Sequence, residues 1–459
     1  MKIINHSTLQ TTKMEELIEK YHQIYKENLS SISNSIQGVS EIRKAALGDF
    51  LTKGFPEKKD ERYKHTFIKN EFNNSYLFDL KDSSYKFSLD DVFHCDVPNL
   101  NTETISVING KYAEQEKLTV HENGLIIGSL KEASIKYPEI FQKYFSKSIN
   151  NNDVVSSLNT LLSIDGFFVY VPKNLIVEHP IQLINILSGK EDLSVSPRNL
   201  FIIEENSQVK LVVCDHTLSA NKFLSNSVTE IFAEENAIFD FYNLQNQHNG
   251  ASNISSVFIK QKKHSVVSAG LFTLHGGLVR NNVNVIMDDE HCENNLYGLY
   301  LTDRFQHIDN YVNIEHSKPN CRSNQLFKGI LDDTATGAFN GRILVKQDAQ
   351  NTVAFQRNNN ILLTNDAKIN TKPQLEIYAD DVKCSHGATV GRLDENAMFY
   401  MRSRGISEKE ARMLLMFGFA YEVIKEIKVD GIRERIDDMV AKRLRGELSR
   451  CSNCVINCC

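Results

Sequence analysis

A cysteine and a histidine two positions apart, Cys384 and His386, are the residues whose types and spacing best fit chemistry. They follow the run QLEIYADDVK. If that strand continues, the two side chains point to the same side of it. A thiolate and an imidazole that face one way can bind iron or zinc. Two ligands are too few, because structural zinc sites and iron–sulfur clusters usually take four. Either the other ligands come from elsewhere, or this is an ordinary pair at the end of a strand.

A second group of thiols lies at the end of the chain, at Cys451, Cys454, Cys458 and Cys459. A C-x-x-C pair can bind a metal or cycle as a dithiol, but a zinc site usually needs a second pair at some distance. All four thiols lie within the last nine residues, so a disordered tail is the favoured interpretation. The nine cysteines have irregular spacing, which predicts free thiols in a reducing compartment rather than a disulfide framework.

No standard catalytic motif accompanies these residues. The chain has no G-x-x-x-x-G-K-[ST] loop, no G-x-S-x-G elbow and no H-E-x-x-H helix. Its 52 basic and 58 acidic residues give a formal net charge of −6, which does not indicate binding to nucleic acid or an acidic membrane. No apolar run approaches the length of a membrane span, and MKIINHSTLQ has no apolar core. A cytoplasmic location is therefore expected.

The strands that must position the Cys–His pair begin at Gly166, where FFVYVPKNLIVEHPIQL alternates with the period of a strand. Strand patterns continue to about Ile377, and the run EEN at 204–206 returns at 234–236. Asparagine, which tolerates left-handed turns, is abundant throughout this part. A repeat near 30 residues with several short strands favours a parallel β-helix. An antiparallel sandwich or barrel is the alternative, because periodicity alone does not separate them.

Helical patterns flank the strands on both sides, and they are expected to cover the two ends of the solenoid. They occupy the first 60 or so residues and the two runs SLKEASIKYPEIFQKYFSKSI and DVVSSLNTLLSI. Near the C-terminus, Ser407 and Glu410 form a capping box, and an apolar stripe that includes Met413 and Phe417 follows. That stripe packs either on the rest of the chain or in a partner's groove.

The predicted organisation has four parts. Residues 1–165 form a mostly helical region, 166–383 a parallel β-helix, 384–450 a helical domain, and 451–459 a cysteine-rich tail.

Three stretches resemble the SufB/SufD family of iron–sulfur cluster assembly proteins, and its SufD branch in particular. The longest is DDVKCSHGATVGRLDENAMFYMRSRGISEKEARMLLMFGFAYEVI, which is similar to the C-terminal signature of that branch. GFPEKKDERYKHT resembles an early family motif, with Tyr63 where tryptophan is usual, and DGFFVYVPKNLIVEHPIQL resembles the entry to the family's β-helix. The SufB branch would show a Thr-Thr-Ser run where this chain has Gly387 to Gly391.

The resemblance implies a mainly β fold, with a right-handed parallel β-helix between an N-terminal helical region and a C-terminal helical domain. It implies a protein that is not an enzyme by itself. Such a protein pairs with a SufB-like paralogue through the β-helix and binds a SufC-like ATPase through the C-terminal helices. The oligomeric state of the chain alone is left open, with a homodimer as one candidate. ATP would act only through the ATPase, and an iron–sulfur cluster or iron would be held transiently at the paralogue interface.

The resemblance also assigns residues. His386 matches the family's interface histidine, a candidate ligand of the cluster or iron, and Cys384 matches the cysteine two positions before it. The missing ligands would then come from the partner. The ATPase-docking region matches residues 403–427, of which the candidates are Ser403, Arg404, Gly405, Ile406, Ser407, Met413 and Phe417. The cysteine-rich tail has no counterpart in the family pattern and receives no role.

Two other functions remain as alternatives. One is a SufB-like scaffold that assembles a cluster on its own, which a stable cluster on the isolated chain would favour. The other is a β-helix enzyme that acts on carbohydrates. Such enzymes are mostly exported and bind sugars with exposed aromatic side chains, whereas this chain has no tryptophan, no export signal and many free thiols.

Overall fold

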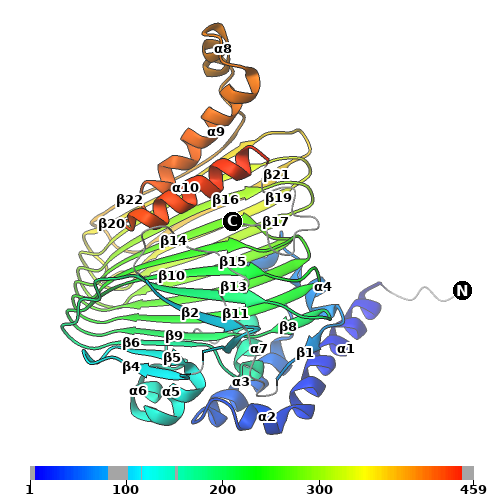
Figure 1. Cartoon of the computed structure of the whole chain (residues 1–459), viewed down its shortest axis with the longest axis vertical. Coiled ribbons are helices and arrows are strands. Elements are labelled where there is room, and N and C mark those ends of the chain that lie inside the picture. The colour runs from blue at the N-terminus through cyan, green and yellow to red at the C-terminus, as the bar shows by residue number, and fades with distance from the viewer. Residues whose placement is uncertain (1–5, 81–101, 115, 150–152, 447–459) are drawn as a thin grey trace, which may run out of the picture.

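Two long sheets that face each other dominate the protein, with helices around one end and along one side (Figure 1). The computed structural model describes residues 6–80, 102–114, 116–149 and 153–446. From β9 onward, consecutive strands lie in opposite sheets, and each strand pairs in parallel with the strand two places along the chain. This arrangement is a β-solenoid. It confirms the predicted parallel β-helix and excludes the sandwich.

The strands divide between sheet I and sheet II. Sheet I contains β4 (Leu118–Val120), β5 (Ile126–Ser129), β6 (Phe167–Val171), β9 (Arg198–Ile203), β11 (Phe223–Ala233), β13 (Ala251–Gln261), β15 (Leu278–Met287), β17 (His307–His316), β19 (Thr336–Val345) and β21 (Lys368–Ile377), with β1 (Leu77–Phe78) and β8 (Leu193–Val195) beside them. Sheet II contains β3 (Lys111–Tyr112), β2 (Glu103–Ile108), β7 (Ile181–Leu187), β10 (Gln208–Thr217), β12 (Ile238–Asn246), β14 (Val266–His275), β16 (Glu293–Thr302), β18 (Arg322–Leu331), β20 (Thr352–Leu362) and β22 (Val382–Gly391).

The coils repeat at the predicted interval. In sheet II, Val209 pairs with Phe239 and Phe239 with Val267, which are steps of 30 and 28 residues. The turn that enters each of these coils needs one residue in the left-handed region, and Asn206 and Asn236 supply it with φ of 58°. Asparagine adopts this conformation more readily than most residues. Between residues 199 and 370, however, only Asn206, Asn236, Asn320 and Asn351 have a positive φ, and most of the other asparagines lie within strands, so the turns do not explain its abundance. Most strands from β10 onward are ten or eleven residues long, longer than the short strands that were predicted.

Alternate side chains of every coil point into the solenoid and form its lumen. The lumen core is aliphatic and aromatic, and it includes Leu211, Phe241 and Phe327. Close stacking between coils requires glycine at some positions. A Cβ at Gly298 would lie 2.1 Å from the Phe327 ring, so any side chain there would displace the aromatic ring from the lumen.

Helices gather around the N-terminal end of the solenoid. They are α1 (His6–Glu27), α2 (Leu29–Ser33), α3 (Ser40–Lys53), the 3₁₀ turn η1 (Glu61–Tyr63), α4 (Ile68–Asn73), α5 (Leu130–Lys136), α6 (Pro138–Tyr144) and α7 (Val154–Leu162). These elements match the helical patterns of the sequence. The region up to residue 165 also gives strands β2 to β5 to the two sheets, because Ile105, Val107 and Ile127 alternate into the lumen core.

A buried ion pair fastens α7 to the first coils. The Arg198 guanidinium on β9 lies 2.7 Å from the Glu230 carboxylate on β11, and neither side chain is exposed to solvent. Arg198 also donates to Asn159 and Thr160 of α7, at 3.3 and 3.1 Å. Glu230 accepts three further bonds from the backbone amides of residues 146 and 148 and from the Ser148 hydroxyl. A charge this deep is tolerated only because it is paired and hydrogen-bonded.

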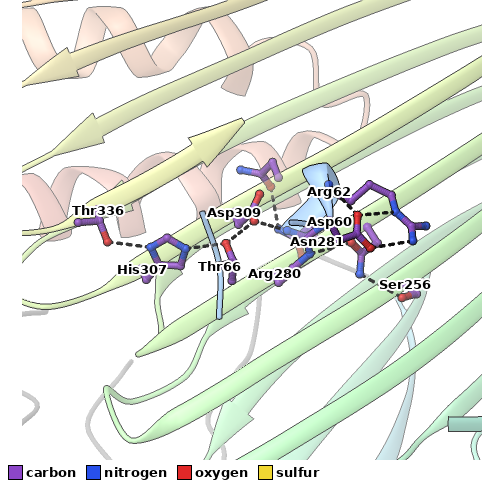
Figure 2. A network of polar contacts seen from close by, with 11 residues as sticks. Asp60, Arg62, Thr66, Ser256, Arg280, Asn281, His307, Asp309 and Thr336 are labelled. Carbon is purple, nitrogen blue, oxygen red and sulfur yellow. Dashed lines mark hydrogen bonds and ion pairs between the residues drawn. The ribbon is translucent and has the colours of Figure 1, made fainter. Parts of the chain in front are cut away.

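The GFPEKKDERYKHT segment is held on the outer face of sheet I by a polar network (Figure 2). Thr66 Oγ1 donates to the Asp309 carboxylate and lies 2.8 Å from His307 Nε2. Arg280, fully buried, pairs with Asp309, and its guanidinium lies 4.1 Å from the centre of the Tyr63 ring. An aromatic ring at this position therefore covers a buried cation, a contact that tyrosine can make as tryptophan does.

Of the three C-terminal helices, the second and third lie along the side of the solenoid rather than over its end, and the first projects beyond the last coil (Figure 1). They are α8 (Glu395–Ser403), α9 (Glu408–Ile424) and α10 (Asp430–Leu444). Met416 and Ala420 of α9 and Ile436 of α10 pack on outward-facing residues of sheet II such as Leu299. The expectation that helices cover both ends is therefore wrong at the C-terminal end, because the apolar partner of α9 is the outer face of sheet II. Among the described residues, no helix is both long enough and apolar enough to cross a membrane.

Candidate functional site

The last coil of the solenoid leaves a sheet edge open in each sheet. Strand β22 ends sheet II and pairs on one side only, with β20, and β21 ends sheet I, paired only with β19. Within the described ranges, no strand or helix continues either sheet beyond them. Strand β22 runs to Gly391 and so carries the solenoid past the boundary predicted at residue 383. Its backbone stays in register with β20 from Val382 to that glycine.

The register of β22 directs Cys384 and His386 over the open lumen. Cys384 lies beside Ala354 of β20, and His386 beside Gln356. Both of these β20 residues are buried lumen residues, 0% and 1% exposed, so their neighbours on β22 point the same way. The predicted common direction of the thiol and imidazole is therefore confirmed.

The two side chains differ in their surroundings. Cys384 is half-buried against an apolar cluster that includes Ile343, Val345 and Ala379, and this burial raises the pKa of its thiol. His386 is exposed, with no residue stacked above it in the described part of the chain. The imidazole is thus open to a ligand or partner, while the thiol stays mostly protonated at neutral pH until a metal or a base removes its proton.

Two ligands do not make a complete metal site. The residues that the structure describes contain no group of three or more histidine, cysteine or acidic side chains placed to hold a metal ion. Any iron or cluster at this edge would need further ligands from outside the described residues, in agreement with the count of two ligands in the sequence.

A second exposed feature is formed by α8 and the start of α9. None of the residues of α8 is buried, and the helix stands beyond the last coil, away from both sheets (Figure 1). Phe399 and Tyr400 are 75% and 60% exposed on it, and Leu414 of α9 is 45% exposed. An exposed apolar group of this kind on a projecting helix is typical of a protein interaction site.

The predicted docking residues lie around the connection between α8 and α9. Gly405 has φ of 87°, which permits the sharp turn, and Ser407 accepts from the Glu410 amide at 3.2 Å to begin α9 with the predicted capping box. The remaining candidates fall into two groups. Ser403 and Arg404 are exposed, and Ile406, Met413 and Phe417 are half-buried.

Sequence reasoning missed two parts of this surface. Phe399 and Tyr400 were not predicted as exposed. The sequence of α8 does contain a signal, because its two aromatic residues are adjacent and belong to no apolar stripe. The open edge of β21, with Ile377 40% and Tyr378 64% exposed at its end, was also missed. The tail cysteines from Cys451 to Cys459 lie outside the described residues, as does Cys95.

Comparisons with known proteins cover nearly the whole chain. Residues 185–419 match the family described as "SUF system FeS cluster assembly, SufBD core domain", and residues 15–183 match "SufBD protein N-terminal region". A SufBD family protein of Synechocystis is 29% identical over 441 residues, which cover 93% of this chain and 96% of that protein.

Two relatives named as the iron–sulfur cluster assembly protein SufD are similar over shorter stretches. The protein of Escherichia coli is 39% identical over 175 residues, which cover 38% of this chain and 41% of the relative. The protein of Bacillus subtilis is 24% identical over 331 residues, 71% of this chain and 75% of the relative.

Proposed function

The chain belongs to the SufBD family of iron–sulfur cluster assembly proteins, and from that premise we propose that it is a non-catalytic, SufD-like subunit of an assembly complex. In this role it pairs with a SufB-like paralogue through the last coil of the solenoid and binds a SufC-like ATPase through α8 and α9. The cluster, or the iron that enters it, is cargo held between the two solenoids. ATP is used by the ATPase subunit alone.

The open last coil is the observation that carries this proposal. A free strand edge presents a row of backbone donors and acceptors, which another strand can satisfy by adding to the sheet. Strand β22 has such an edge along its whole length, and β21 offers a second one in sheet I. A SufB-like solenoid with a matching edge would extend both sheets and bury Ile377 and Tyr378, which are exposed in the single chain.

Such a partner would also complete the ligand set. His386 and Cys384 point over the lumen, so a strand added beyond β22 would place its own side chains opposite them. The exposed imidazole is suited to meet iron or a cluster first, and the half-buried thiol to join once its proton is lost. Iron or a cluster that is bound by side chains of two protein chains can be released when the chains separate.

We predict that His386→Ala leaves the complex assembled but slows cluster formation about tenfold or more, the scale on which metal sites respond to loss of a supporting group. The reason is that the exposed imidazole supports no core packing, so its loss should not disturb the fold. Purified complex would be supplied with iron and a sulfide source, and the rise of cluster absorbance followed.

Lys383→Ala is the matched control, because Lys383 is exposed on the same strand and faces away from the lumen. A His386→Ala complex that forms clusters at the wild-type rate would rule out the ligand role. A complex that fails to assemble would instead give the histidine a role in pairing.

We predict that the double substitution Phe399→Ala and Leu414→Ala weakens binding of the ATPase at least about tenfold, or about 1.4 kcal/mol. These side chains are exposed in the single chain, so their truncation removes interface contacts with little loss of folding stability. The affinity of the purified chain for the ATPase would be measured by titration calorimetry.

Ile176→Ala serves as the control for the loss of exposed apolar surface, because Ile176 is 62% exposed in a solenoid turn far from α8 in the chain. Unchanged affinity in the double variant would remove α8 and α9 from the interface. The pairing with the paralogue should be unaffected in every case, which separates the two interfaces.

A further inference from the structure

Two buried thiols lie on adjacent coils at the edge of the solenoid, away from Cys384. Cys292 directly precedes β16 and Cys321 directly precedes β18, and the next residues, Glu293 and Arg322, are register partners. The Arg322 amide donates to the Cys292 carbonyl at 2.9 Å, so the parallel register extends to the cysteines. Their exposed fractions are 1% and 0%. The family resemblance gives neither residue a role.

The two side chains converge on one carbonyl oxygen. The Sγ atom of Cys292 lies 3.1 Å from the Asp289 carbonyl oxygen, and that of Cys321 lies 3.2 Å from the same atom. Cys292 is also 3.2 Å from the Lys262 carbonyl oxygen. Because Asp289 belongs to a half-exposed turn, the thiols lie directly beneath the surface and not deep in the lumen.

The thiols of Cys292 and Cys321 differ in acidity. A hydrogen bond from Cys292, together with the neighbouring His316, lowers the pKa of the Cys321 thiol to about 5. The same hydrogen bond, together with burial, raises the pKa of Cys292. Cys321 is thus the more acidic thiol of the pair and the first to form a thiolate. A thiolate with a second thiol in contact is the arrangement that oxidation converts to a disulfide.

We propose that Cys292 and Cys321 are an oxidative modification site, at which a hydroperoxide closes a disulfide between two adjacent coils. The Cys321 thiolate attacks the outer peroxide oxygen, and the O–O bond breaks. The transferred OH group makes a sulfenic acid on Cys321, and the alkoxide leaves and takes up a proton to become the alcohol. The Cys292 sulfur, as it loses its proton, then attacks the Cys321 sulfur, and water leaves as the S–S bond forms. Two thiols are oxidised, and one hydroperoxide is reduced to an alcohol and water.

The backbone spacing suits this bond. Neighbouring strands lie about 4.7–4.9 Å apart, and disulfides join Cα atoms that are about 4.4–6.8 Å apart, so the bond can form with little movement of either coil. Cys214 offers the contrast. It is also buried, but its side chain lies 3.8 Å from the Gln182 amide and has no second thiol in its cluster. A metal site at the pair is not favoured, because no group of three suitable ligands occurs in the described residues.

The test treats the reduced full chain with tert-butyl hydroperoxide at neutral pH, blocks the remaining thiols with N-ethylmaleimide, and digests with trypsin. Trypsin separates the two cysteines by cutting after Arg304. The expected product is one peptide pair, joined through Cys292 and Cys321, with two hydrogens fewer than the separate peptides. Both cysteines found alkylated, under peroxide that has oxidised other thiols of the chain, would overturn the proposal.

Two variants test the order of the steps. In Cys292→Ala the sulfenic acid has no thiol to attack it, so dimedone should trap it on Cys321. In Cys321→Ala the remaining Cys292 should react with peroxide at least tenfold more slowly than Cys321 does in Cys292→Ala, because burial raises the pKa of the Cys292 thiol whereas Cys321 keeps the neighbouring His316, which lowers its pKa. Equal reaction of the two variants would contradict the assigned roles.

Cys214→Ala is the matched control and should form the cross-linked pair at the rate of the unmodified chain. Circular dichroism and thermal melting show whether each alanine variant is folded. If either cysteine variant fails to fold, the peptide map of the unmodified chain alone decides the proposal.

Discussion

Replacing Arg198 by methionine is expected to lower the free energy of unfolding by about 3–5 kcal/mol, the range found when one partner of a buried ion pair is removed. The methionine fills a similar volume but leaves Glu230 charged and without its cation, at a site where neither side chain is exposed. Glu230 keeps its bonds to the Ser146 and Ser148 amides. The loss should therefore fall within this range rather than beyond it. Urea denaturation followed by circular dichroism measures it.

Two further variants give this prediction its control. The double variant Arg198→Met with Glu230→Gln should recover part of the loss, because no unpaired charge then remains. Lys173→Met, which breaks an ion pair with Glu205 whose partners are 60% and 40% exposed, should change the free energy of unfolding by less than about 1 kcal/mol. A loss in Arg198→Met as small as in Lys173→Met would mean that the buried pair does not hold α7 on the solenoid.

Lowering the pH from 7 to 4 is expected to release α10 from sheet II. Two histidines lie at this contact. His216 is among the residues that face Ile432 and Ile436 of α10, and His275 lies close to Arg443. Burial, together with the positive charge of Arg435 near His216 and of Arg443 near His275, lowers the pKa of each imidazole to about 4. An unfolded chain would take up protons on both imidazoles near pH 6.5, whereas the folded chain does not.

The sign of the effect follows from that difference. Between pH 6.5 and 4 the unfolded state binds more protons than the folded state, so folding stability falls as the pH falls. A shift from 6.5 to about 4 corresponds to about 3 kcal/mol for each histidine at the low end of this window. Burial raises the pKa of Asp165 and Asp215, which acts in the opposite direction. The net curve alone therefore does not isolate the histidines.

Comparison of variants isolates them. His216→Gln removes one of the two titrations, so the difference in stability between pH 7 and pH 4 should shrink by about 3 kcal/mol. His264→Gln, at an exposed turn position, should leave that difference unchanged. The measurement is thermal and urea denaturation at both pH values, with hydrogen exchange to show whether α10 opens first. An unchanged difference in His216→Gln would contradict the assignment of the acid effect to this interface.

The coils were predictable from the sequence because each one repeats the same local rules. Asn206 and Asn236 mark equivalent turns, and the apolar residues between them alternate with the period of a strand. The Cys384 and His386 pair was predictable for the same reason, since residues two apart on any strand share a face. The capping box at Ser407 is likewise a local signal that needs no knowledge of the fold.

What the sequence could not indicate is which outer faces are covered. In β16 both the lumen residue Leu296 and the outward residue Leu299 are apolar. Such a strand reads as a continuous hydrophobic run, as in any sheet buried on both sides. The pattern does not say that α9 lies on one of those faces. Arg280 is a similar case, because its partner Tyr63 is more than 200 residues away in the chain, and a lone arginine in a strand is usually exposed.

In the part of the chain that the structure describes, only the last coil has long open edges, and this also limits how many chains can join. The opposite limits of the two sheets are β3 and β4, strands of two and three residues, which are too short to template a long strand. An end-to-end contact through β21 and β22 therefore uses both of the long open edges found among the described residues of each participant. Two identical chains, or two related ones, would close into a pair related by an approximate twofold axis, and a third could not be added by the same contact. In such a closed pair no long sheet edge is left free, so the contact does not lead to polymerisation, the usual hazard of an unpaired edge.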